Sequence, residues 1–100
     1  MESITLDAYI VRTLMRDLLG HDHKPAAFAV YLWLATEAER TNAAVAISYA
    51  SLAEETGLSR SATQSSVAWL LQRELLRVTH ASVTAIPEYT VLQPWRRRRR

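Results

Sequence analysis

The chain of 100 residues has no cysteine, only two glycines and three prolines. Without cysteine it forms no disulfide and no thiolate metal site, and a reducing cytoplasm is the simplest compartment. Two isolated glycines, Gly20 and Gly57, do not make a glycine-rich phosphate loop. The longest apolar run, Ala26–Ala35, is ten residues, well short of the roughly 20 that a membrane span needs. The acidic N-terminus lacks a secretory signal pattern, so we expect a cytoplasmic protein without a membrane segment.

The charged residues are distributed unevenly along the chain. The formal charge is +2, from twelve Lys and Arg against ten Asp and Glu. Five of the basic residues are Arg96–Arg100, so residues 1–95 carry seven basic and ten acidic residues and a net charge of −3. We therefore predict one domain over residues 1–95 and a basic tail over 96–100 that binds phosphate. A solubilising end and a site for an acidic protein partner are the alternatives for the tail.

Two helices are predicted in the first half of the chain. Apolar residues at three- and four-residue steps indicate a helix over 3–20, with Gly20 as its C-cap. Pro25 suits the first turn of a second helix over 25–40. Because Ala26–Ala35 is apolar on every side, this helix is either central to the fold or part of a dimer interface. We expect a homodimer through these two helices.

The second half of the chain has the pattern of a helix-turn-helix followed by a hairpin. A short strand is expected over 45–48, and the paired helices over 48–74, with Ser48 and Ser59 as N-caps and Gly57 in the turn. Alternating apolar residues then predict a hairpin over 76–92, with strands over 76–82 and 89–92. The expected fold is mainly α with a small β-hairpin wing and an extra N-terminal helix.

The string SLAEETGLSRSA, residues 51–62, resembles the winged helix-turn-helix transcription factors of bacteria, the MarR-like and related families. The resemblance covers Val45 to Leu92, about half of the chain. It implies that the helix from Ser59 to Glu74 enters the major groove of DNA with its N-terminal residues toward the bases. It therefore implies a sequence-specific protein for double-stranded DNA, acting as a dimeric transcriptional regulator. A winged-helix protein-interaction module and a replication or plasmid-maintenance initiator module are the alternatives.

The resemblance also implies which side chains contact DNA, and by position the outward residues of this helix are Ser59, Arg60, Ser61, Gln64, Ser65 and Ala68. Arg60 is expected to bind guanine and Gln64 adenine, while serines donate to phosphates or bases. The complete set of expected contacts is Tyr49, Ser51, Ser59, Arg60, Ser61, Gln64, Ser65, Arg96, Arg97, Arg98, Arg99 and Arg100. The chain departs from the family where many members carry Arg or Lys, because Ser65 and Ala68 are small. The wing segment, residues 81–87, also contains no Lys or Arg, so the tail is expected to supply much of the affinity.

Other candidate sites are weaker. His21, Asp22 and His23 are metal-ligand types, but adjacent residues point apart, so a polar turn is expected and no metal. Trp95 is expected to attach the end of the last strand to the body, with stacking on a base as the alternative. No nucleophile with a neighbouring base and no carboxylate pair in a pocket context is found. We therefore expect neither enzymatic activity nor a cofactor.

Overall fold

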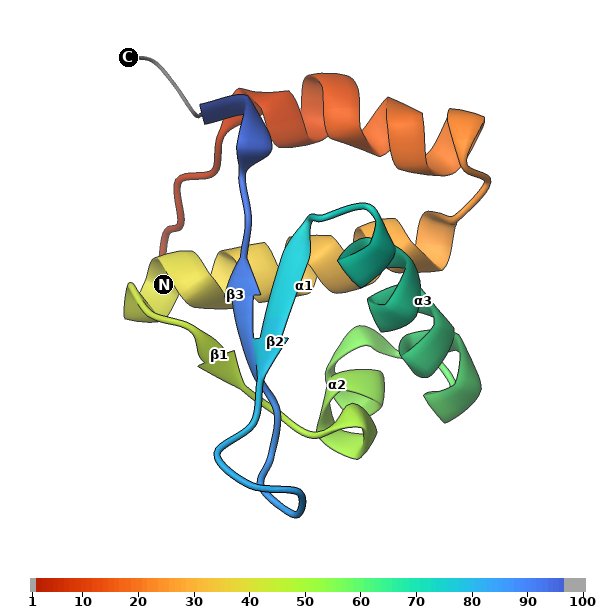
Figure 1. The fold of residues 1–100 in the computed structure, drawn as a ribbon. Helices are drawn as coiled ribbons and strands as arrows, with labels where there is room; N and C mark the ends of the chain where they lie inside the picture. Colours follow the sequence, from red (N-terminus) through yellow and green to blue (C-terminus); the bar gives the residue numbers. More distant parts are fainter. Residues whose placement is uncertain (1, 97–100) are drawn as a thin grey trace.

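The computed structural model describes residues 2–96. Within them the chain is mainly helical, with a small three-stranded antiparallel sheet (Figure 1). An N-terminal helix over residues 8–21 contains two π-helical stretches, η1 and η2. The elements in order are η1 Ile10–Leu14, η2 Asp17–His21, α1 Pro25–Thr41, β1 Val45–Ala46, α2 Tyr49–Thr56, α3 Arg60–Gln72, β2 Leu76–Thr79, β3 Glu88–Val91 and the 3₁₀ turn η3 Pro94–Arg96. No helix in residues 2–96 is long and apolar enough to cross a membrane.

Helix α1 is the centre of the fold. It packs against α2, α3, the N-terminal helix, β1 and β3, and it begins with Pro25 in its first turn, as predicted. The side chains of Val30, Tyr31 and Leu34 are fully buried. Of the two explanations for the all-round apolar run, the central position is therefore the observed one. Six of the ten residues of the run are buried within one chain and the other four are half-buried, so the run no longer requires a dimer.

The N-terminal helix begins later than predicted, at residue 8 rather than residue 3. The helix starts directly after Asp7, whose carbonyl accepts a hydrogen bond from the Ile10 amide at 3.0 Å, and the Tyr9 backbone helps to lower the pKa of the Asp7 carboxyl. An Asp in this position caps a helix by satisfying amides that have no helical partner. Gly20 is also not the C-cap: the helix continues through it, and His23, with φ 58°, takes the left-handed conformation after the end.

The sheet joins the expected hairpin to the short strand that precedes α2. Its order is β1-β3-β2, with Val45 opposite Tyr89, and Val78 on the other side of Tyr89. Tyr89 and Leu76 are buried against the helices. The strands are shorter than predicted, since β1 ends at Ala46 and β2 at Thr79. The Tyr31 hydroxyl donates to the Leu92 carbonyl at 2.9 Å and so links α1 to the end of β3.

Candidate nucleic-acid interface

The α2–turn–α3 unit is held by local hydrogen bonds that its sequence predicts. The Ser48 hydroxyl accepts from the Ser51 amide, and the Ser59 hydroxyl from the Ala62 amide, both at 3.1 Å. Gly57 adopts φ 78°, and its amide donates to the Ala53 carbonyl at 2.9 Å. A left-handed residue costs an L-amino acid about 1–2 kcal/mol, so glycine suits this turn. The two N-caps and the turn thus fix where each helix begins and where α2 ends.

The side of α3 that faces away from the core is polar. Thr63, Ser66, Val67 and Leu70 are buried beneath the helix. The residues predicted to point outward are all exposed, namely Ser59, Arg60, Ser61, Gln64, Ser65 and Ala68. The structure therefore gathers the α3 members of the expected contact set on one surface, which we call the α3 face.

Several hydroxyls on and near the α3 face already have backbone partners. The Ser65 hydroxyl donates to the Ala62 carbonyl at 3.2 Å, and the Ser59 hydroxyl caps the helix. Ser61 and Gln64 make no hydrogen bond with another described side chain, and Arg60 makes no ion pair within residues 2–96. These three side chains are the part of the α3 face that is available to a ligand.

The two expected contacts at the start of α2 differ from each other. Ser51 is exposed and remains a candidate for a phosphate contact. Tyr49 is half-buried and packs against the core beside Tyr89. Burial, together with the neighbouring Tyr49 hydroxyl, raises the pKa of Tyr89. Tyr49 is therefore mainly a packing residue in this structure.

The arginine tail does not begin beside the α3 face. In Figure 1 the described C-terminal end lies beside the start of the N-terminal helix, at the end of the molecule opposite α2 and the loop between β2 and β3. Arg96 donates to the Asp7 carboxylate at 2.9 Å and forms an ion pair with it. The described C-terminal end and the start of α3 are thus separated in the structure (Figure 1). Arg97–Arg100 lie outside the described residues.

The wing loop between β2 and β3 is apolar at its tip. Val83 is 99% exposed and Ile86 58% exposed, and residues 80–87 include no Lys or Arg. The loop closes with a hydrogen bond from the Ala85 amide to the Ser82 carbonyl at 3.2 Å. It lies at the same end of the molecule as α2 (Figure 1), so a surface that docks on both meets the apolar tip of the loop and the exposed carboxylates of Glu54 and Glu55 on α2.

Two aspartates, Asp22 and Asp7, tie the N-terminal helix to the rest of the chain, a role that the sequence did not predict for either of them. Asp22 Oδ2 accepts from Trp69 Nε1 and from Arg73 Nε, each at 2.9 Å, and its Oδ1 lies 2.9 Å from His21 Nδ1. The Lys24 ammonium lies 4.8 Å from the Trp69 ring centroid. Burial raises the pKa of Asp22, but the hydrogen bonds outweigh it and hold this pKa below its usual range. We call these residues the Asp22 cluster.

The second aspartate repeats this arrangement at the other end of the helix. Asp7 Oδ2 accepts from Trp95 Nε1 at 2.8 Å as well as from Arg96, and these hydrogen bonds lower the pKa of Asp7. Tyr9 stacks on Trp95 with ring centroids 4.3 Å apart. Trp95 therefore attaches the chain beyond β3 to the body, as predicted. A sequence signal existed only for Asp7, as a helix-capping type before an apolar-periodic segment.

The histidine-containing turn does not gather metal ligands. Within residues 2–96 no group of three or more His, Asp or Glu is placed to hold a metal ion. His21 does contact Asp22, but the Asp22 carboxylate is already shared with Trp69 and Arg73. The turn instead connects the N-terminal helix to α3.

Comparison of the chain with protein-family models, with curated proteins and with solved structures finds no match.

Proposed function

We propose that the protein binds double-stranded DNA as a winged helix-turn-helix, with the α3 face in the major groove. The observation that carries this proposal is that Arg60, Ser61 and Gln64 are exposed within the first turns of α3. The N-cap at Ser59 fixes where this helix begins, and its opposite side is buried in the core. An arginine fork fits guanine O6 and N7, and a side-chain amide fits adenine N6 and N7. The proposed role is regulation of transcription.

In this proposal two copies bind together through the N-terminal helix. Val11, Met15 and Leu19 follow one another at four-residue steps along it, and Val11 and Leu19 are 54% and 40% exposed. Helix α1, also expected in the interface, has six residues of its apolar run buried within one chain. A two-fold pair would place the α3 helices in successive major grooves, roughly 34 Å apart. Sedimentation of the Val11→Glu variant tests this interface, because a charge there should yield monomers.

The DNA proposal is tested by selecting genomic fragments with the purified protein at low salt. We expect enrichment of a common sequence, which the Arg60→Ala, Gln64→Ala double variant loses. Arg16→Ala is the matched control, because Arg16 is an exposed cation on the N-terminal helix and its loss should leave the enriched sequence unchanged. A chain cut after Arg96 keeps the Asp7 contact and should bind all fragments more weakly. No enrichment by the intact protein, or the same enrichment by the double variant, contradicts the proposal.

A protein-interaction module is the second candidate, and the charges favour it. Arg60 is the only cation in residues 48–68, which also contain Glu54 and Glu55. Val83 and Ile86 give the wing an exposed apolar tip. A phosphate backbone gains little electrostatic attraction from such a surface. A protein partner with apolar and basic groups would gain from contact with both the apolar tip and the two carboxylates. This candidate is supported if no DNA fragment is enriched and one purified protein binds saturably. The Val83→Asp variant should then lose the binding of that protein.

A further inference from the structure

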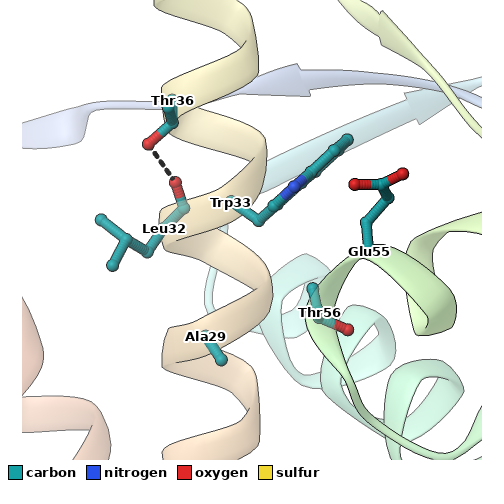
Figure 2. A pocket seen from close by; sticks show the side chains of 6 residues that line it. All are labelled: Ala29, Leu32, Trp33, Thr36, Glu55 and Thr56. Atoms are coloured by element: carbon teal, nitrogen blue, oxygen red, sulfur yellow. Dashed lines mark hydrogen bonds between the residues drawn. The ribbon is translucent and has the colours of Figure 1, made fainter. Parts of the chain in front are cut away.

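A pocket of about 360 Å³ lies between α1 and α2, away from the α3 face. It is lined by Ala29, Leu32, Trp33, Thr36, Glu55 and Thr56. Figure 2 shows the Trp33 indole extending from α1 and the Glu55 carboxylate from α2, toward the same space. Its volume falls in the range of sites for small organic ligands. The lining is mostly carbon, so an occupant would gain from apolar contact.

The carboxylate of Glu55 is the distinctive polar group of this pocket. Both threonine hydroxyls are already used, since Thr36 donates to the Leu32 carbonyl at 2.8 Å and Thr56 to the Leu52 carbonyl at 2.8 Å. Glu55 forms no ion pair and no side-chain hydrogen bond with any residue among 2–96, and it is exposed. Arg40, which lies along the adjoining groove past Trp33, is paired with Glu37. The pocket therefore presents a carboxylate that no described cation neutralises.

Trp33 differs from the other two tryptophans of the chain. Trp69 and Trp95 each donate their indole N–H to an aspartate. The Trp33 N–H has no hydrogen-bond acceptor within the described part of the chain, and the ring is only partly buried. Its π-face attracts a cation, most strongly of all the aromatic side chains. An aromatic face beside an unneutralised carboxylate is complementary to a group that is both apolar and positively charged.

We propose that the pocket between α1 and α2 binds a small hydrophobic organic cation, with its ammonium at Glu55 and its apolar part against Trp33. A neutral ligand of the same shape would gain the apolar contact alone. An anion would be repelled by Glu55. This inference is independent of DNA binding, because it uses no residue of the α3 face.

The test compares three probes of similar size, namely phenethylammonium, 2-phenylethanol and 3-phenylpropionate. Each is titrated into ¹⁵N-labelled protein, and the indole N–H signal of Trp33, assigned with Trp33→Phe, is followed. We expect the cation to bind about three- to thirty-fold more tightly than the alcohol, from one cation–π contact and one exposed ion pair. The anion should bind most weakly of the three.

Two variants locate the charge preference. Glu55→Gln keeps the shape of the pocket and should weaken binding of the cation about two- to five-fold while leaving the alcohol unchanged. Glu54→Gln is the matched control, because Glu54 is the neighbouring exposed carboxylate on α2 and does not line the pocket. Equal binding of the three probes, no shift of the Trp33 signal, or equal effects of the two variants would overturn the proposal.

Discussion

Replacing Asp22 should destabilise the fold by an amount that the Asp22 cluster allows us to work out. The side chain of Asp22 is 4% exposed, whereas those of Arg73 and His21 are 38% and 86% exposed. In Asp22→Ala, water can solvate the two exposed partners, so each contributes about 0–1 kcal/mol. The partly buried Trp69 N–H loses a hydrogen bond to a charged acceptor, worth about 1.5–3 kcal/mol. Because the two exposed partners contribute near the lower end of their range, we expect a total loss of about 2–3 kcal/mol at pH 7.

Urea and thermal unfolding measure this loss. At about 4–8 °C per kcal/mol for a domain of this size, the midpoint should fall by about 10–20 °C. Asp22→Asn keeps the shape but removes the charge and one acceptor, so it should lie between the wild type and Asp22→Ala. Asp17→Asn on the same helix is the control and should stay within about 0.5 kcal/mol. An Asp22→Ala protein as stable as the control would refute the reasoning.

The pH dependence of the same difference tests whether charge is the cause. Folding lowers the pKa of Asp22. The contribution of the Asp22 charge to the stability of the fold is therefore fully present above the unfolded pKa of about 3.9. It is lost as the pH falls through the lower folded pKa. The stability difference between wild type and Asp22→Asn should therefore be constant from pH 7 to about 5 and shrink below about 4. A difference that stays unchanged at the lowest pH where both proteins fold would exclude the charge as its source.

Three further changes have expected outcomes. Gly57→Ala should lower the free energy of unfolding in urea by about 1–2 kcal/mol, because φ is 78°, although a Cβ there meets no atom within 4 Å. Gly20→Ala, in a helix with the same open space, should instead raise this free energy by about 0.5–1 kcal/mol. Equal effects of the two substitutions would contradict the backbone explanation. Ser59→Ala removes the α3 N-cap and should cost about 0.5–2 kcal/mol and lower helical circular dichroism near the midpoint; an unchanged midpoint would show that the cap is dispensable. Tyr31→Phe leaves the Leu92 carbonyl without its donor and should cost about 1 kcal/mol by thermal unfolding, and no loss would mean that water replaces the hydroxyl.

The parts of the fold that the sequence predicted are those with local causes. Pro25, Ser48, Gly57 and Ser59 act through neighbours within a few residues, so the positions of α1, α2 and α3 follow from the pattern to within two residues. The exposed side of α3 followed from helical spacing alone. The start of the N-terminal helix was misplaced because Ile4 and Leu6 extend the apolar spacing beyond the cap.

The long-range polar contacts had no comparable signal. Asp22 lies 47 residues before Trp69, and Asp7 lies 88 residues before Trp95, so no local periodicity links them. The pairing of β1 with β3 also joins segments that lie before α2 and after α3 in the chain. The pocket at Trp33 and Glu55 likewise needs the packing of α1 on α2 before its two groups meet. Only Asp7 was recoverable in principle, as a cap.

These internal contacts also limit how the protein can attract phosphate. Arg40, Arg73 and Arg96 are paired with carboxylates, and Lys24 lies over the Trp69 ring. The α3 face therefore offers DNA the single cation of Arg60, for which counterion release gives a slope of about −0.9 in log K against log salt. A steeper slope that persists after removal of Arg97–Arg100 would require further cations, either the exposed Arg12, Arg16 and Arg77 of the same chain or those of a second copy. If the chain without Arg97–Arg100 shows a slope of about −0.9, hydrogen bonds from Ser61 and Gln64, rather than charge, provide most of the binding at the α3 face.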